Sequence, residues 1–263
     1  MTELIEGIDI SKYQGSVDQA TWRALKKSGQ EVAVVGSWHG RDGNPHCEEN
    51  LLRAAAQGMK IATYTVLNGS QPGNAAVSQG KSFCGNVWSD LRFVAIDCEL
   101  DGITETHIRQ AEAAIIAEGQ TPIIYTAYWW WHDHFGNPNS FSHLPLWNAY
   151  YDQQPDIDFQ KLPYGGWQDV VIEQYAGSVQ LEGVTVDRNS FRKEFIYPKK
   201  EEDDMPQLWR LKKEHEQTTF ITDGLLKAHV KDKKALKELQ DAGVWPKEIK
   251  VVSKEALDQI PTI

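Results

Sequence analysis

The stretch Phe93–Leu100, FVAIDCEL, joins an apolar run to two carboxylates. The apolar part is typical of a strand buried on both faces, as in a parallel sheet. Asp97 and Glu99 follow at its end, and residues two apart on a strand point to the same side, roughly 6.5 to 7 Å apart. One ligand can therefore contact both acids. We expect Cys98 between them to point the other way, toward a helical layer, as a small buried apolar residue.

Similar apolar runs recur along the first three quarters of the chain and predict eight strands in all. They cover residues 4–10, 31–38, 60–67, 93–100, 121–128, 144–150, 169–175 and 184–189. Helices are predicted over 17–28, 48–57 and 104–118, because each pattern ends at a glycine, which favours the left-handed backbone at a helix C-terminus. Only the early strands are followed by helices. This order predicts an α/β barrel related to the (β/α)8 type, with an open doubly wound sheet as the alternative.

Acidic residues lie at several of the predicted strand ends, where barrels of this type carry their active sites. Asp9 ends the first strand, Asp97 and Glu99 end the fourth, and Asp187 ends the eighth. Because the first and eighth strands are neighbours in a closed barrel, Asp9 and Asp187 should meet, with the fourth strand opposite. A single aspartate at a strand end is more often a turn residue or helix cap. Four carboxylates in one cleft, however, raise the pKa of at least one, which can then donate a proton near neutral pH.

Composition excludes several classes of function. The chain has 263 residues, is 41% hydrophobic and 24% charged, and carries a formal net charge of -10, which argues against a nucleic-acid partner. No run of about 18 apolar residues predicts membrane insertion, and the N-terminus lacks the basic and apolar regions of a signal peptide. Three cysteines without a CxxC pair suggest neither disulfides nor zinc. His132 and His134 lack further ligands at metal spacing, so we predict no metal and no cofactor.

Five segments stand in the order and at the approximate spacing of a known family. They are GIDISKYQG (7–15), FVAIDCEL (93–100), PIIYTAYWW (122–130), LPLWNAYYD (144–152) and IEQYAGSVQLEGVTVDRNSF (172–191). Over about residues 4 to 196 the chain resembles the glycoside hydrolase family 25 lysozymes, the Chalaropsis-type muramidases common among phage endolysins. The resemblance implies a flattened TIM-like (β/α)5(β)3 barrel, in agreement with the count of elements.

The resemblance also implies a reaction and a role for each acid. Members of the family cleave the β-1,4 bond between N-acetylmuramic acid and N-acetylglucosamine in peptidoglycan. By motif, Glu99 is the general acid, and Asp97 positions the 2-acetamido group of the substrate, whose carbonyl oxygen can serve as an internal nucleophile. Asp9 and Asp187 hold the hydrogen bonds of the site and tune the proton affinity of Glu99. The sequence leaves open whether the anomeric configuration is retained or inverted.

Aromatic residues near the predicted strand ends suit a sugar-binding cleft, because flat rings stack on pyranose faces. The candidates for substrate binding are Tyr64, Tyr125, Trp147, Gln174 and Tyr175. For Tyr125 and Trp147 the alternative is that they fill the core. The run YWWWHDHFG, residues 128–136, holds more aromatic bulk than a short helix can bury on one face, so part of it should line a groove or an interface.

The composition changes after the barrel segment. We assign residues 1–198 to the catalytic barrel, 199–207 to a charged linker, and 208–263 to a small α+β module. Within this module, residues 218–230 predict a hairpin and residues 232–244 an amphipathic helix. About 55 residues are marginal for an independent core, so the module is expected to lean on the barrel or to self-associate. Its expected function is cell-wall binding or homo-oligomerisation.

Together these patterns and the resemblance predict a peptidoglycan hydrolase. We expect it to act as a phage endolysin that waits in the host cytoplasm and depends on a holin to reach the wall. The residues leave two alternative functions open. One is a non-catalytic barrel that binds peptidoglycan without cutting it, although the presence of all four acids favours an enzyme. The other is a different amino-sugar glycosidase, such as a chitinase-like enzyme.

Overall fold

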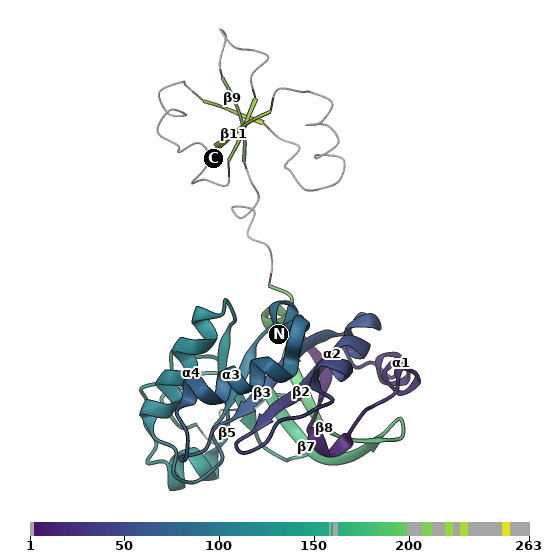
Figure 1. Ribbon diagram of the computed structural model, residues 1–263, viewed down its shortest axis with the longest axis vertical. Helices are drawn as coiled ribbons and strands as arrows, with labels where there is room; N and C mark the ends of the chain where they lie inside the picture. The colour runs from purple at the N-terminus through teal and green to yellow at the C-terminus, as the bar shows by residue number, and fades with distance from the viewer. Residues whose placement is uncertain are drawn as a thin grey trace. The chain divides into compact units, whose positions relative to one another are not determined.

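The computed structural model describes residues 3–157, 159 and 163–198, together with four short strands in the last quarter of the chain. The chain divides into two compact units, Met1–Tyr197 and Pro198–Ile263 (Figure 1). Each unit is described by itself. Within the described ranges, every helix is too short or too polar to span a lipid bilayer.

The first unit is a closed barrel of eight strands in sequence order. The strands are β1 (Leu4–Ile10), β2 (Val32–His39), β3 (Lys60–Val66), β4 (Val94–Asp97), β5 (Pro122–Ala127), β6 (Leu146–Ala149), β7 (Ile172–Leu181) and β8 (Val184–Arg192). Neighbours from β1 to β7 are parallel, whereas β8 runs antiparallel to both β7 and β1. The predicted barrel is therefore confirmed, and the open sheet is excluded.

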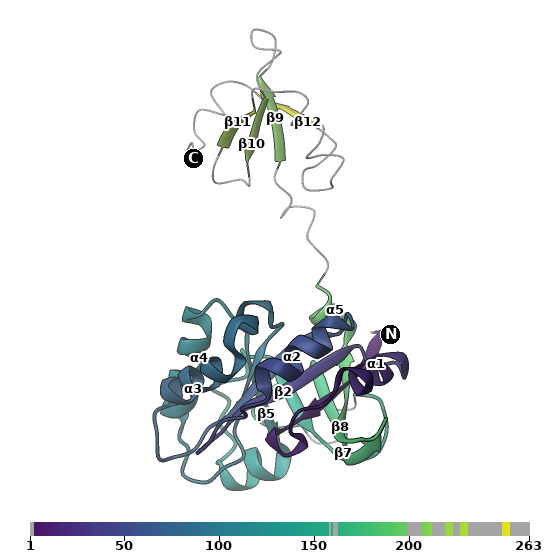
Figure 2. The same cartoon turned by 45° about the vertical axis from the view of Figure 1, so that its right-hand side comes forward.

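Helices cover the outside of the early strands (Figure 2). The helical elements are η1 (Lys12–Gln14), α1 (Gln19–Lys27), α2 (Cys47–Ala56), α3 (Gly73–Cys84), η2 (Gly85–Asp90), α4 (Glu105–Ala117), the π-helix η3 (Trp129–His134) and the short α5 (Lys193–Ile196). The sequence prediction missed α3, because its buried side is made of small residues rather than an apolar stripe. At Gly80 an added Cβ would lie 2.5 Å from Thr65 Oγ1 and 2.8 Å from Ser37 Oγ, so the small residue permits the close approach of α3 to β2 and β3.

Two apolar layers hold this unit together. One fills the inside of the barrel and includes Val34, Phe93 and Phe191. The other lies between the barrel and its helices, and it includes Cys98, which is fully buried, in the same layer as Ile96. The predicted orientation of Cys98 toward the helical layer is confirmed. Successive residues of β4 thus alternate between the two layers, so Asp97 points to the inside of the barrel.

The second unit contains a four-stranded sheet in the order β11-β10-β9-β12. Its strands are β9 (Gln207–Leu211), β10 (Thr219–Thr222), β11 (Lys227–Val230) and β12 (Ile249–Val252). β10 and β11 pair antiparallel, as the predicted hairpin requires, and β12 pairs parallel to β9. The predicted helix at 232–244, and the predicted linker apart from Gln207, lie outside the described residues.

Candidate active site

The four acids reach one end of the barrel from three different strands. Asp9 lies near the carboxyl end of β1 and is the register partner of Asp187 on β8. Asp97 is the last residue of β4, and Glu99 follows in the loop that leads to α4. Asp187 was predicted to lie at the end of the eighth strand, but β8 continues to Arg192. Because β8 is antiparallel to β1, its beginning, and not its end, lies at this rim, and Asp187 still meets Asp9.

Burial raises the pKa of all four carboxyls, and it is the largest cause in each case. The pKa of Glu99 rises to about 7. The pKa of Asp9 also rises to about 7, with the charges of Asp187 and Glu99 adding to burial and two hydrogen-bonded amides opposing it. For Asp97, the charge of Glu99 is the second cause. A carboxylic acid that can donate a proton is therefore present in the cluster near neutral pH.

Asp9 is held by two amide side chains from the last two strands. Gln174 Nε2 and Asn189 Nδ2 each donate to Asp9 Oδ2 at 2.8 Å. Both amides are buried, with exposed fractions of 1% and 0%. One oxygen of Asp9 therefore accepts two N–H groups from different strands.

The oxygens of both amides are bonded in turn to aromatic side chains. Tyr125 Oη and Tyr151 Oη donate to Gln174 Oε1 at 2.8 and 2.7 Å. Trp147 Nε1 donates to Asn189 Oδ1 at 2.8 Å. These bonds form a continuous network from the inside of the barrel to Asp9.

Asp97 has a different environment. It is 7% exposed, and its Oδ1 is buried without a hydrogen-bond partner among the described residues. The backbone N–H of Glu99 bonds to the Asp97 carboxyl and lowers its pKa, but burial and the Glu99 charge outweigh this effect. A buried carboxyl oxygen without a partner is unusual in a folded protein and marks a place where a ligand group can bind.

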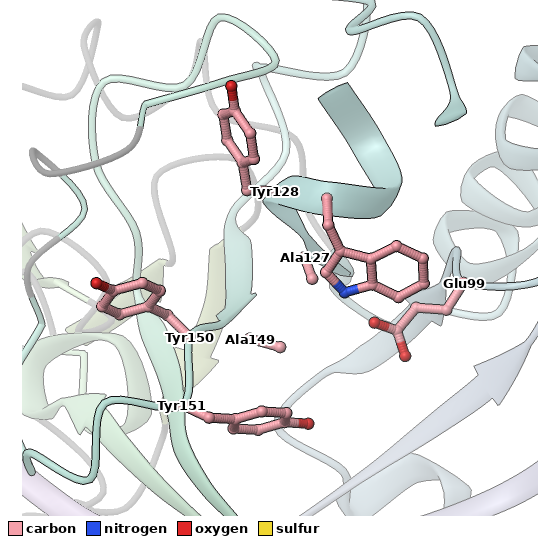
Figure 3. Close-up of a pocket in the computed structure, with 7 residues that line it drawn as sticks. Glu99, Ala127, Tyr128, Ala149, Tyr150 and Tyr151 are labelled. Atoms are coloured by element: carbon pink, nitrogen blue, oxygen red, sulfur yellow. The ribbon is translucent and has the colours of Figure 1, made fainter. Parts of the chain in front are cut away.

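A cavity of about 350 Å³ opens beside Glu99 (Figure 3). Figure 3 shows the Glu99 carboxylate and the Tyr151 ring extending toward the same space. Most of the lining is aromatic, and two of these rings, Trp129 and Tyr151, are 53% and 57% exposed. The lining residues are Glu99, Ala127, Tyr128, Trp129, Ala149, Tyr150 and Tyr151. Exposed flat rings next to a proton donor are the arrangement expected for a sugar-binding cleft.

Three of the predicted aromatic residues lie inside the barrel. Trp147 is 1% exposed, and its ring centroid lies 4.6 Å from that of Tyr125 and 6.4 Å from that of Tyr64. The core-filling alternative therefore holds for Trp147, which is too enclosed to stack on a sugar. The Tyr64 ring fits inside the barrel because its neighbour on β2 is Gly36, where an added Cβ would lie 2.3 Å from the ring. The predicted Gln174 lies beneath Asp9 and bonds to it rather than lining the cavity.

Tyr175 is not part of this site, so its predicted position in the cleft was wrong. Its hydroxyl donates to Glu6 Oε2 at 3.0 Å, and the Arg188 guanidinium lies 5.2 Å from its ring centroid. Gln174 points inward to Asp9, and the next side chain on a strand points to the opposite face. Tyr175 therefore packs on the outside of the barrel.

Sequence reasoning did not single out Asn189, Tyr150 or Tyr151. Asn189 lies two residues after Asp187, so strand alternation could have placed both on one face. The aromatic run at 128–136 was interpreted correctly in part: Trp130 and Trp131 are 4% and 0% exposed, whereas the exposed Trp129 lines the cavity.

The two histidines of this run have separate partners. His132 Nδ1 lies 2.8 Å from Asp133 Oδ1, and the His134 ring packs edge-on against Trp129. Elsewhere in the described part of the chain, three carboxylates bring oxygens within 4.8 Å of one another, close enough to share a cation. They are Asp152, Asp156 and Glu173. Acidic groups of this kind are common in proteins without a bound ion, so the cluster by itself assigns no metal.

Known proteins are similar to this chain in sequence and in fold. The chain is 26% identical over 198 residues to a curated protein named probable GH family 25 lysozyme 3 from Dictyostelium discoideum, covering 70% of the chain and 40% of that relative's length. The bacterial lysozyme from Streptomyces coelicolor superposes with a TM-score of 0.59 at 21% identity, covering 73% of this chain and 93% of that one. The muramidase from Acremonium alcalophilum gives a TM-score of 0.56 at 20% identity, covering 71% and 93%.

The sequence profile of the glycosyl hydrolases family 25 matches residues 8–184, which is more than half of the chain. The match begins one residue before Asp9 and includes the whole of β2 to β7. It covers three of the four acids and ends three residues before the fourth, Asp187. With the closed eight-stranded barrel already established, this match shows that the chain belongs to glycosyl hydrolases family 25.

Proposed function

We propose that the chain is an N-acetylmuramidase that cleaves the β-1,4 bond between N-acetylmuramic acid and N-acetylglucosamine in peptidoglycan. One observation carries the proposal: Glu99, with a pKa raised to about 7, lies next to a buried Asp97 whose Oδ1 lacks a partner. A proton donor is thus adjacent to a carboxyl that a ligand can complete. Family membership, and the names lysozyme and muramidase of the similar proteins, agree with this reaction.

In the proposed reaction Glu99 acts as the general acid. Its proton passes to the glycosidic oxygen as the bond from that oxygen to the anomeric carbon breaks. Burial supports this role, because it keeps the carboxyl protonated at a pH where an exposed glutamate would be ionised. The aromatic cavity beside Glu99 supplies rings for stacking on the adjoining sugar.

Asp97 acts on the 2-acetamido group of the substrate. Its unpartnered Oδ1 accepts the acetamido N–H and turns the carbonyl oxygen of that group toward the anomeric carbon. Attack by this oxygen leads to retention of configuration, whereas direct attack by water leads to inversion. NMR of the first product formed distinguishes these routes, because they give opposite anomers.

The test compares wild type with Glu99→Gln on purified cell walls, using the release of new reducing ends as the readout. We expect Glu99→Gln to lose activity while its circular dichroism and melting temperature stay near those of wild type. Asp101→Asn is the matched control, because Asp101 is exposed in the same loop. Full activity of Glu99→Gln would overturn the assignment.

The same assay separates the two alternatives. A non-catalytic barrel binds cell walls but releases no reducing ends in any variant. A chitinase-like enzyme releases reducing ends from chitin oligomers, which lack the lactyl group of muramic acid, at least as fast as from peptidoglycan. The proposed muramidase prefers peptidoglycan.

We further propose that the protein acts as a phage endolysin that reaches the cell wall through a holin, with residues 208–263 binding the wall or forming homo-oligomers. The support for this role is the resemblance of the sequence motifs to phage endolysins. Expression in a susceptible bacterium with and without a pore-forming membrane protein tests it. Lysis only when both are produced is the expected result, and lysis at the same rate without the pore contradicts the dependence.

A further inference from the structure

Two neutral amides converge on a single oxygen of Asp9. Gln174 Nε2 on β7 and Asn189 Nδ2 on β8 both lie 2.8 Å from Asp9 Oδ2. A carboxyl oxygen that accepts two N–H groups is favoured in its ionised form, since a proton on that oxygen would displace a donor. The geometry therefore opposes protonation of Asp9 at this oxygen.

Neither amide can turn its oxygen toward Asp9 without losing a hydrogen bond. Trp147 Nε1 is a donor only, so the oxygen of Asn189 must face it and the NH₂ group must face Asp9. Gln174 Oε1 accepts from the two hydroxyls of Tyr125 and Tyr151, which leaves its NH₂ group for Asp9. The amide orientations are thus determined by aromatic donors on β5 and β6 and in the loop after β6.

We propose that Gln174 and Asn189 are positioning residues that lower the proton affinity of Asp9 and thereby favour Glu99 as the holder of the proton of the acid cluster. The inference rests on the proposed role of Glu99 as general acid. Asp9 and Glu99 compete for this proton, because a charge on either one raises the proton affinity of the other.

Neutral donors suit this task better than a lysine or arginine. A cation beside Asp9 would also lower its proton affinity, but its field would extend to Glu99 and favour loss of the proton there. An amide N–H acts mainly on the oxygen it contacts. The titratable groups that face Asp9 come from every side of the site and are Asp187 on β8, Asp97 on β4, Glu99 after β4, Tyr64 on β3, Tyr125 on β5 and Tyr151 after β6.

The test measures the pH dependence of kcat/KM on soluble uncrosslinked peptidoglycan strands, by release of reducing ends. Asn189→Leu and Gln174→Met each remove one donor from Asp9 Oδ2 with little change of side-chain size. Asp9 then takes the proton in preference to Glu99. We expect the alkaline limb of the profile, where the general acid ionises, to move to lower pH by about 0.5 to 1 unit.

Two further variants make the test decisive. Gln174→Glu keeps the shape and both tyrosine donors but adds a negative charge to the cluster. Because that charge raises the proton affinity of Glu99, the alkaline limb of this variant should move in the opposite direction, to higher pH. Tyr197→Phe is the control, because it removes a hydroxyl that donates to the Glu31 carboxylate at the opposite end of the barrel. Its alkaline limb should stay at the wild-type pH.

The outcomes separate this inference from the proposed function. If kcat/KM falls in the folded Gln174 and Asn189 variants while the alkaline limb stays in place, the two residues have only a structural role and the inference is wrong. If Glu99→Gln is inactive in the same assay, the proposed function stands whatever these variants show. If Glu99→Gln is active, the proposed function itself fails.

Discussion

Asp9 and Asp97 face the same site and are buried to nearly the same extent, 5% and 7% exposed, yet they differ in their hydrogen bonds. Asp9 Oδ2 accepts two amide N–H groups, which are themselves held by aromatic donors. Asp97 Oδ1 accepts none. Among the described residues, Asp9 Oδ2 thus has two donors, whereas Asp97 Oδ1 has none and can accept one from a ligand.

This difference implies separate roles, because Asp9 belongs to a preorganised hydrogen-bond network and Asp97 can bind a ligand group. A buried polar group without a partner costs about 1 to 3 kcal/mol, and a substrate that supplies the missing donor recovers this free energy on binding. A group whose partners are already in place gains nothing from a ligand, but it fixes the charge distribution that the ligand meets. Asp97 is therefore expected to affect substrate turnover most directly, and Asp9 the protonation of its neighbours.

The largest expected effect is at Asp97. Asp97→Asn removes the carboxylate that orients the acetamido group and should lower kcat by about 10²- to 10⁴-fold. The free energy of unfolding at pH 7 should not fall, because the variant buries no charge. Steady-state kinetics with chemical denaturation measures both. Near-wild-type kcat in the folded variant would show that the unpartnered oxygen has no catalytic use.

A smaller effect, on stability, is expected at Asp9. Its pKa in the folded state is about 7, above the ordinary 3.8, because burial outweighs the two amide hydrogen bonds, so the folded state binds this proton more tightly than the unfolded state does. The contribution of this group to stability is therefore highest below pH 4, declines as the pH rises to about 7, and is constant above. Asp9→Asn avoids this loss.

Asp9→Asn should accordingly leave stability unchanged at pH 4 and raise the free energy of unfolding at pH 8, by on the order of 2 to 4 kcal/mol. Urea denaturation at the two pH values is the measurement. An equal change at both pH values would mean that packing, and not the charge of Asp9, determines the result.

The smallest effect is expected at Tyr175, which lies outside the site. Tyr175→Phe removes the hydrogen bond to Glu6 and should cost about 1 kcal/mol of stability. The value of kcat/KM on cell walls should stay within twofold of wild type. A large rise in KM with unchanged stability would return Tyr175 to the substrate-binding cleft.

The sequence predicted those features that follow from local periodicity. In FVAIDCEL, the alternation along the strand was enough to place Asp97 and Cys98 on opposite sides. Alternation could also have excluded Tyr175 from the cleft, because it follows the inward-pointing Gln174. The prediction instead followed from its aromatic side chain, which suits a sugar-binding site, and not from its place on the strand. Helix α3 was missed because small residues, and not an apolar stripe, face the barrel.

The network around Asp9 could not be predicted in this way. Its members come from β1, β5, β6, β7 and β8 and from the loop after β6, and they meet only because the barrel closes with β8 antiparallel to β1. Neither spacing nor composition specifies which amide bonds to which carboxyl. Long-range closure of the sheet determines these contacts.

Mass spectrometry of the muropeptides released from purified cell walls tests the central claim most directly, because it identifies the bond that is cut. We predict fragments with N-acetylmuramic acid at the new reducing end from wild type, and none from Glu99→Gln. Fragments with N-acetylglucosamine at the reducing end, or the same products from Glu99→Gln, would contradict the account.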